Sequence, residues 1–462
     1  MVTPTHTTAR MYDVGFGDCL LLTFHYRDDP NPIDGVVREE RHMLVDFGST
    51  RYPYSGFKLQ RVTEAIAART GGKLDVVVAT HRHKDHVSGF GVKKPSEEIE
   101  AMKPGLIIRP WPDHPDATND TRSPVGENDR EFARQLRGIH TFAEAAVAEY
   151  GESRAVNARA ISALADMGLA NKGAIDNLVR WSRRSGAEAK YVVAGEVVDL
   201  APRIPGVTMD ILGPPSLDQV PGLTSQRADS PEYWLRGARR QANRLSGSRS
   251  FDDDVFDVLG GDNGIGAAAW LVRRLESRTA GQLLQIVRAF DDALNNTSIV
   301  ALVNSGTSSM LVSGDAQIEN WRHTLNRIKE PTAEEPNEAF DADLRERLAR
   351  VDLYKIGHHG SRNGTPISMH ELWTEHRDMR RKMTFLMSTK HGVHGHSAAT
   401  AVPNPRLETA FKGVRQSRYY STEDLRGRRP ERPDEDQNYR AYVGSTSRTS
   451  GTFGRFEPED AY

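Results

Sequence analysis

Four short apolar segments of this chain are each followed, within ten residues, by histidine or aspartate. The first segment, residues 74–79, leads into His81, His83, Asp85 and His86 within six positions. Apolar runs of about four to eight residues bounded by turns are typical of buried strands. Proteins commonly build sites from side chains on loops at one edge of a rigid sheet. The pattern therefore favours an α/β fold with a site where strands end.

The other three apolar segments lead into one aspartate and into paired histidines. These residues are Asp315 after 310–312, His358 and His359 after 353–356, and His394 and His396 after 385–387. Taken singly, a Gly-Asp turn or a histidine in a glycine loop is an ordinary surface feature. Four such strand ends in one chain are better explained by a shared site.

The residue types in the first run are those of a metal site. Successive side chains of an extended segment alternate in direction, so His81 and His83 can share one metal ion. The next turn of the chain then offers Asp85 and His86 to a neighbouring position. Imidazole and carboxylate suit Zn²⁺, which is favoured, or Mn²⁺. The alternative is a solvated polar loop in a chain that contains 16 histidines.

The composition limits the class of protein. The formal net charge is −2, so binding of nucleic acid would have to depend on a local basic patch. Cys19 is the one cysteine, which excludes an internal disulfide and fits a reducing compartment. No run approaches the roughly 18 apolar residues of a membrane span. A cytoplasmic protein without membrane association is expected.

Alternating strand and helix patterns organise most of the 462 residues. A helix is expected at 60–69, where apolar residues recur at helical spacing before a Gly-Gly stop. Strands are expected at Cys19–His25, 43–47, 74–79, 106–108, 191–193, 207–212, 298–303, Ser309–Val312 and Met383–Met387.

Three segments do not fit this alternation. Residues 111–190 are rich in alanine and charge and predict a helical insertion, and residues 216–293 predict a second insertion that is polar and partly helical. The segment 426–462 is rich in Arg, Pro, Asp and Glu, which is typical of a partly disordered tail. Within that tail, residues 439–443 have the apolar content to dock on the rest of the chain.

Several motifs resemble those of one protein family. His81–His86 reads HRHKDH, like the HxHxDH signature of the metallo-β-lactamase superfamily. Other segments resemble the branch formed by the hydrolase domain of the competence channel ComEC and its free-standing relatives. In chain order these are DVGFGD at 13–18, LVDFG at 44–48, NNTSIV at 295–300, SGD at 313–315, HHGS at 358–361 and GH at 395–396. The resemblance implies a metallo-β-lactamase αββα sandwich with helical insertions, formed by a hydrolase domain over residues 1–425.

The resemblance also assigns roles to individual residues. It implies two divalent metal ions, the first held by His81 and His83 and the second by Asp85 and His86. Asp315 would bridge the two ions. The remaining assignments are His359 as a further ligand of the second ion, Asp46, His358 and Asn296 as residues that orient ligands, and Asp85 and His396 as the catalytic side chains.

The chain departs from the wider superfamily at one position. Most members supply a further histidine to the first metal from a segment before the bridging aspartate, whereas this chain has Asn295 and Asn296 there. On the sequence alone, water would complete the first position.

The implied reaction is hydrolysis by a dinuclear centre with a bridging hydroxide. A phosphodiesterase or nuclease is favoured, with DNA suggested by the channel relatives. Arg236, Arg239 and Arg240 are candidate phosphate contacts, although an arginine-rich segment is more often a solvated surface. Two alternatives stay open. One is a hydrolase of a small substrate, such as a cyclic nucleotide, a phosphorylated head group, a lactam or a thioester, and the other is a non-catalytic module.

Overall fold

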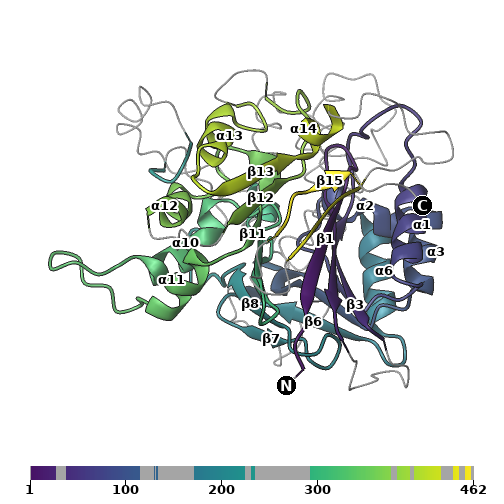
Figure 1. The fold of residues 1–462 in the computed structure, drawn as a ribbon. Helices are drawn as coiled ribbons and strands as arrows, with labels where there is room; N and C mark the ends of the chain where they lie inside the picture. Colours follow the sequence, from purple (N-terminus) through teal and green to yellow (C-terminus); the bar gives the residue numbers. More distant parts are fainter. Residues whose placement is uncertain are drawn as a thin grey trace, which may run out of the picture.

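The strands of the protein form two mixed sheets that face each other (Figure 1). The computed structural model describes residues 2–27, 38–114, 129–130, 132–133, 171–223, 230–234, 292–375, 382–395, 400–427, 441–446 and 453–458. The first sheet has the order β15 (Glu457–Pro458), β14 (Ala441–Ser445), β1 (His6–Tyr12), β2 (Cys19–His25), β3 (Glu40–Phe47), β4 (Val76–Val78), β5 (Leu106–Pro110) and β6 (Glu188–Val192). The second has the order β13 (Ser417–Ser421), β12 (Met383–Met387), β11 (Leu353–Lys355), β10 (Ser309–Val312), β9 (Val300–Asn304), β8 (Thr208–Gly213) and β7 (Val197–Asp199).

Side-chain alternation along the strands divides the apolar core into layers. On β3, Met43 and Val45 pack between the two sheets, whereas Leu44 faces the opposite way, toward helices. The second sheet behaves in the same manner, since Val312 lies between the sheets and Leu311 faces outward. Both sheets are therefore buried on two faces, which explains why their central strands are apolar runs rather than alternating sequences.

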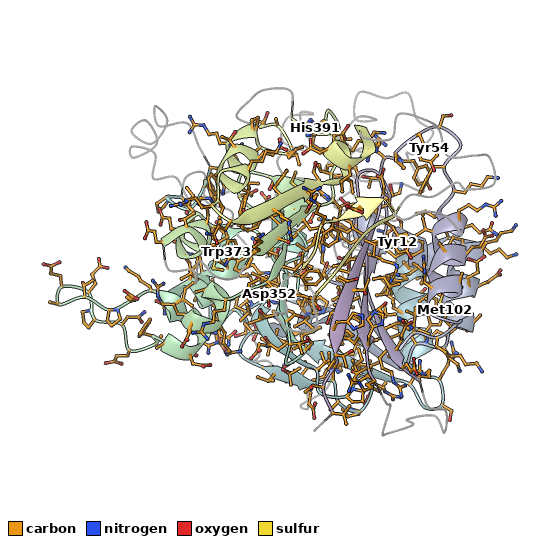
Figure 2. All side chains as sticks on the ribbon, in the orientation of Figure 1. Tyr12, Tyr54, Met102, Asp352, Trp373 and His391 are labelled. Atoms are coloured by element: carbon orange, nitrogen blue, oxygen red, sulfur yellow. The ribbon has the colours of Figure 1, made fainter. Side chains whose placement is uncertain are left out.

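Helices cover the two outer faces. Against the first sheet lie α1 (Leu59–Arg69), α2 (Lys84–Gly91), α3 (Lys93–Ala101) and α6 (Lys172–Ser182). Against the second lie α10 (Ile318–Ile328), α11 (Ala342–Ala349), α12 (Ile367–Glu375) and α13 (Pro405–Lys412). Trp373 of α12 illustrates the packing, because its fully buried ring contacts the second sheet (Figure 2). The arrangement is an α/β fold of four layers, with helices outside and two sheets inside.

The structure agrees with the sequence over most expected strands. β2, β10 and β12 have the predicted bounds, and α1 differs from its prediction by one residue. β1 was not expected from the sequence, nor was β13. No helix among the described residues is long and apolar enough to cross a membrane.

The predicted insertions and tail overlap with the core. α6 and the start of β6 fall within 111–190, yet α6 buries Leu178 and Trp181 against the first sheet and β6 pairs with β5. These two elements belong to the layers described above, and much of both predicted insertions lies outside the described residues. In the predicted tail, β14 pairs with β1 at the sheet edge.

Two sets of three parallel strands position the site. β3, β4 and β5 run parallel in the first sheet, and β10, β11 and β12 run parallel in the second. The segments that carry the histidines and aspartates follow the carboxyl ends of β4, β10 and β11, while Asp46 lies near the end of β3. The fold thus brings residues from distant parts of the sequence to one end of both sheets.

Candidate metal centre

The segment after β4 changes from extended to helical within a few residues. His83 is extended, with φ −64° and ψ 150°, and α2 begins at Lys84. Asp85 and His86 therefore lie in the first turn of a helix, where the sequence predicts only a turn of the chain. Gly48 makes this approach feasible, since an added Cβ there would lie 2.5 Å from the carbonyl oxygen of Lys84. The end of β3 and the start of α2 are packed backbone to backbone.

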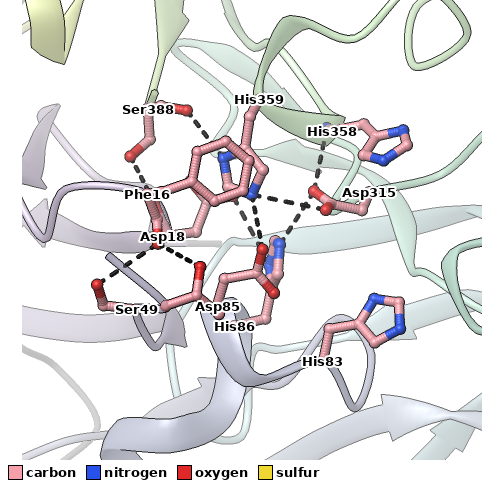
Figure 3. A network of polar contacts seen from close by, with 12 residues as sticks. Phe16, Asp18, Ser49, His83, Asp85, His86, Asp315, His358, His359 and Ser388 are labelled. Atoms are coloured by element: carbon pink, nitrogen blue, oxygen red, sulfur yellow. Dashed lines mark hydrogen bonds and ion pairs between the residues drawn. The ribbon is translucent and has the colours of Figure 1, made fainter. Parts of the chain in front are cut away.

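Four side chains converge where the two sheets meet. Donor atoms of Asp85, His86, Asp315 and His359 all lie within 4.8 Å of one another (Figure 3). His86 Nε2 is 3.0 Å from Asp315 Oδ1, and His359 Nε2 is 3.2 Å from Asp85 Oδ2 and 3.6 Å from Asp315 Oδ2. These are the residues that the sequence assigns to the second metal position, and three different segments supply them.

Asp46 fixes the orientation of His86. Its Oδ2 accepts a hydrogen bond from His86 Nδ1 at 2.7 Å, while Thr80 donates to both carboxylate oxygens through its backbone N–H and its hydroxyl, each at 2.7 Å. With its proton on Nδ1, the His86 ring turns the lone pair of Nε2 toward the cluster. Such an outer hydrogen bond is the usual partner of a metal-bound histidine.

A corresponding arrangement holds His359. Its Nδ1 lies 3.0 Å from the carbonyl oxygen of Ser388, and the Phe16 ring packs against the imidazole at a centroid distance of 4.1 Å. His359 also has a left-handed backbone, with φ 49°. This conformation costs a non-glycine residue of the order of 1 kcal/mol and is found most often at functional sites. The backbone strain and both neighbours direct Nε2 toward Asp85 and Asp315 (Figure 3).

The electrostatics of the cluster favour a bound cation. Burial opposes charge on every member, yet the charges of His86 and His359 hold the pKa of Asp315 well below its usual range. Burial alone would lower the pKa of His86, but Asp315 and Asp46 raise it well above the ordinary value. Both shifts mean that positive charge is stabilised between these carboxylates.

The donor set fits a divalent cation for a geometric reason. If Nδ1 of His86 and of His359 each carry the proton, both Nε2 atoms present lone pairs to carboxylate oxygens about 3 Å away. Lone pairs facing carboxylates at that distance repel unless a proton or a metal ion lies between them. Two imidazoles and two carboxylates are a suitable set for Zn²⁺ or Mn²⁺.

His81 and His83 form a second group beside this cluster. His81 Nε2 lies 3.0 Å from His83 Nδ1, which also lies 3.0 Å from Asn295 Oδ1. The His81 ring packs on the His86 ring with 4.2 Å between centroids, so the two groups adjoin. The structure places Asn295, rather than the expected Asn296, against His83. Asn296 is fully buried, and neither polar atom of its amide has a hydrogen-bond partner among the described residues.

A third acidic group lies behind His86 but already contains a cation. Asp18, Asp46 and His86 also bring donor atoms within 4.8 Å of one another. However, Lys355 Nζ lies 2.7 Å from Asp18 Oδ2, and Asp46 is occupied by Thr80 and His86. The ammonium group supplies the positive charge there, so this group supports the centre rather than forming a separate metal position.

The remaining predicted residues have different outcomes. His358 contributes its backbone N–H, which donates to Asp315 Oδ1 at 3.1 Å, while its ring nitrogen bonds Ser361 at 2.7 Å. His396 and the three candidate arginines, Arg236, Arg239 and Arg240, lie outside the described residues.

His394 is the described histidine of the last segment that lies near the cluster. Its exposed ring packs on Phe16 with 4.7 Å between centroids, and it interacts electrostatically with Asp85 and Asp315. Sequence reasoning selected its neighbour His396 because of the Gly-His pair. His394 is recognised as a neighbour of the cluster because it packs on Phe16, which in turn packs on His359.

The chain matches no family model, and no curated protein matches it. The interpretation of this cluster as a candidate metal centre therefore rests on its own donor atoms. These are the imidazoles of His81, His83, His86 and His359 and the carboxylates of Asp85 and Asp315, together with the groups that orient them.

Proposed function

We propose that this chain is a metal-dependent hydrolase of the metallo-β-lactamase type, similar to the ComEC-like branch, and that it cleaves phosphodiesters. Two features support the type. The motifs that resemble this branch occur in its order along the chain, and the described residues form helical layers outside two facing sheets. The αββα sandwich expected from the resemblance has that same layering.

One observation carries the proposal. Asp85, His86, Asp315 and His359 converge within 4.8 Å, and the His81–His83 pair lies directly beside them. The two oxygens of Asp315 approach His86 and His359, and its charge, like that of Asp85, also acts on His81 and His83. These contacts support the bridging role that the resemblance assigns to Asp315.

Two divalent cations held there would offset charge on phosphoryl oxygens and increase the acidity of water at neutral pH. The protein residues do the remaining work. Asp46 and the Ser388 carbonyl keep the protons of His86 and His359 on Nδ1, so both Nε2 atoms stay available as donors. The backbone N–H of His358 and the ion pair with His86 both hold Oδ1 of Asp315, while Oδ2 lies 3.6 Å from His359 Nε2.

Residues at the exposed side of the cluster would contact the substrate. His394 is exposed, and the Arg51 carbonyl accepts a hydrogen bond of 2.8 Å from the backbone N–H of the intervening Phe16. Arg51 is cationic and acts electrostatically on His394, whose pKa is lowered by partial burial, so Arg51 supplies the positive charge that suits an anionic ester and His394 a neutral imidazole. A phosphodiester is thus favoured over a neutral lactam.

The proposal is tested by removing the bridging carboxylate. Asp315→Ala should bind less metal than the wild type, measured by elemental analysis, and should lose metal-dependent hydrolysis of bis(p-nitrophenyl) phosphate. The matched control is Asp343→Asn, which alters an exposed carboxylate on α11. Full activity of the Asp315 variant would refute the dinuclear assignment. A wild-type protein that binds no divalent metal would refute the function altogether.

A further inference from the structure

We propose that Asn295 is the third protein donor of the first metal position, together with His81 and His83, and that this position binds its ion more weakly than the second. The inference deepens the proposed function and rests on it. It replaces the expectation that only water completes this position, and it uses a residue type outside the common His, Asp and Glu ligands.

The donor atoms of these three side chains are already gathered. His83 Nδ1 lies 3.0 Å from His81 Nε2 and 3.0 Å from Asn295 Oδ1. Ligand atoms bound to one ion at about 2.1 Å lie roughly 3.0–3.4 Å apart for angles between about 90° and 109°. Both observed separations fall within the range of neighbouring ligands on one cation.

One two-centre hydrogen bond accounts for only one of these two contacts. His83 Nδ1 faces another ring nitrogen and an amide oxygen at equal distances, but it carries at most one proton. If that proton is donated to Asn295, the lone pair of His81 Nε2 has no proton to accept from Nδ1. A cation at the meeting point satisfies all three atoms at once.

The backbone holds Asn295 firmly in this position. Asn295 O accepts a hydrogen bond from Ser298 N at 3.0 Å, and Ile299 N donates to Thr80 O at 2.9 Å. The second contact joins the segment before β9 to the residue that precedes His81. Asn295 itself is buried, with 2% of its surface exposed. A rigid, buried amide oxygen beside two imidazoles is a prearranged donor rather than a surface side chain that happens to be near.

The charges explain why the two positions should differ in affinity. Asp85 and Asp315 approach the second position together with His86 and His359. The first position has two neutral imidazoles and a neutral amide and shares only Asp315 with the second. Fewer anionic ligands mean weaker binding of a divalent cation. An amide oxygen also suits Mn²⁺ better than a third histidine would, because carbonyl oxygens suit Mn²⁺ and imidazoles suit Zn²⁺. The second position should fill first.

The experiment is calorimetric titration of metal-free protein with Mn²⁺ alone, followed by electron paramagnetic resonance of the loaded protein. The wild type should bind two equivalents with distinct affinities and give the signal of a spin-coupled pair at saturation. Asn295→Leu should weaken the second equivalent at least about tenfold and lose the coupled signal, while the first equivalent keeps its affinity. Asn295→Asp should tighten the weak equivalent, because it adds a negative charge at the same place.

The matched control is Asn304→Leu, at the far end of β9, where the amide donates to Asp210 at 2.7 Å. It should leave both equivalents unchanged. Two unchanged equivalents in Asn295→Leu would overturn the inference, as would a single equivalent in the wild type. If Asn295→Leu does not fold, an Asn295→Asp variant with unaltered weak binding would overturn it. Absence of any Mn²⁺ or Zn²⁺ binding would instead refute the proposed hydrolase function.

Discussion

An Asp46→Asn variant tests whether Asp46 orients the His86 ring, because the substitution leaves His86 itself in place. In the wild type, the Asp46 carboxylate accepts hydrogen bonds of 2.7 Å from His86 Nδ1, Thr80 N and Thr80 Oγ1. An amide keeps one acceptor oxygen, which the backbone N–H of Thr80 can retain. Its NH₂ group then faces His86 Nδ1, and the ring avoids two opposed donors by moving its proton to Nε2. The nitrogen that faces Asp315 is thereby lost as a metal ligand.

The size of the effect follows from the position of Asp46 outside the ligand set. Loss of such an outer partner typically lowers metal affinity about 10- to 100-fold, which is roughly 1.4–2.7 kcal/mol. Competition with a chromophoric chelator measures this change directly. Thermal unfolding of the metal-free variant should show a separate loss of about 1–3 kcal/mol, because buried hydrogen bonds to a charged group are replaced by poorer ones.

Asp75→Asn is the matched control for this experiment. Asp75 is equally a buried aspartate that accepts from a backbone N–H, here His42 N at 2.7 Å, and it pairs with Arg38 at 2.6 Å. It is remote from the cluster in its contacts, so the variant should lose stability while its metal affinity stays within about twofold. If Asp46→Asn behaved like Asp75→Asn, Asp46 would be merely structural and the reasoning about the His86 tautomer would be refuted.

Three further results are expected. Lys355→Met should destabilise the protein by about 3–5 kcal/mol in urea unfolding, because it leaves Asp18 charged and buried without its partner at 2.7 Å; addition of Asp18→Asn should restore part of this loss, and an additive double variant would contradict the pairing. Burial lowers the pKa of His42 to about 4, so the unfolded chain takes up a proton near pH 6.5 while the folded chain does not. Stability present above pH 6.5 is therefore lost as the pH falls toward 4, and His42→Leu should remove about 3 kcal/mol of that acid sensitivity, whereas unchanged pH profiles would count against it. His394→Ala should lower kcat/KM for a phosphodiester about tenfold or more while metal stoichiometry stays at the wild-type value, and loss of metal would show that His394 is a ligand.

The parts of the fold that the sequence predicts best are those where burial is uniform. β10 and β12 are apolar runs that end at turn residues, and both have the predicted bounds. β1 escapes this reasoning because Ala9 and Met11 face the other sheet while Thr8 and Arg10 do not. Such a short, mixed pattern identifies a strand only once its partners β2 and β14 are known.

In the site, too, the sequence predicts residues that follow a local pattern but not those that depend on the spatial arrangement. The sequence brings out Asp315 and His359 because each follows an apolar strand, and parallel strands end at one edge. The sequence does not distinguish Asn295 from Asn296, because the local backbone conformation decides which of two adjacent amides contacts His83. Nor does it select His394, whose nearness to the cluster depends on Phe16, more than 370 residues earlier in the chain.

The place of β1 in its sheet has a consequence for synthesis of the chain. β1 lies between β2 and β14, so one of its edges pairs with residues about 430 positions later. At a translation rate of about 5–20 residues per second, roughly 20–90 s pass before β14 leaves the ribosome. Throughout that interval the backbone groups on one side of β1 face solvent or a chaperone. Nascent chains that stop before residue 441 would keep that edge open to pairing with other molecules.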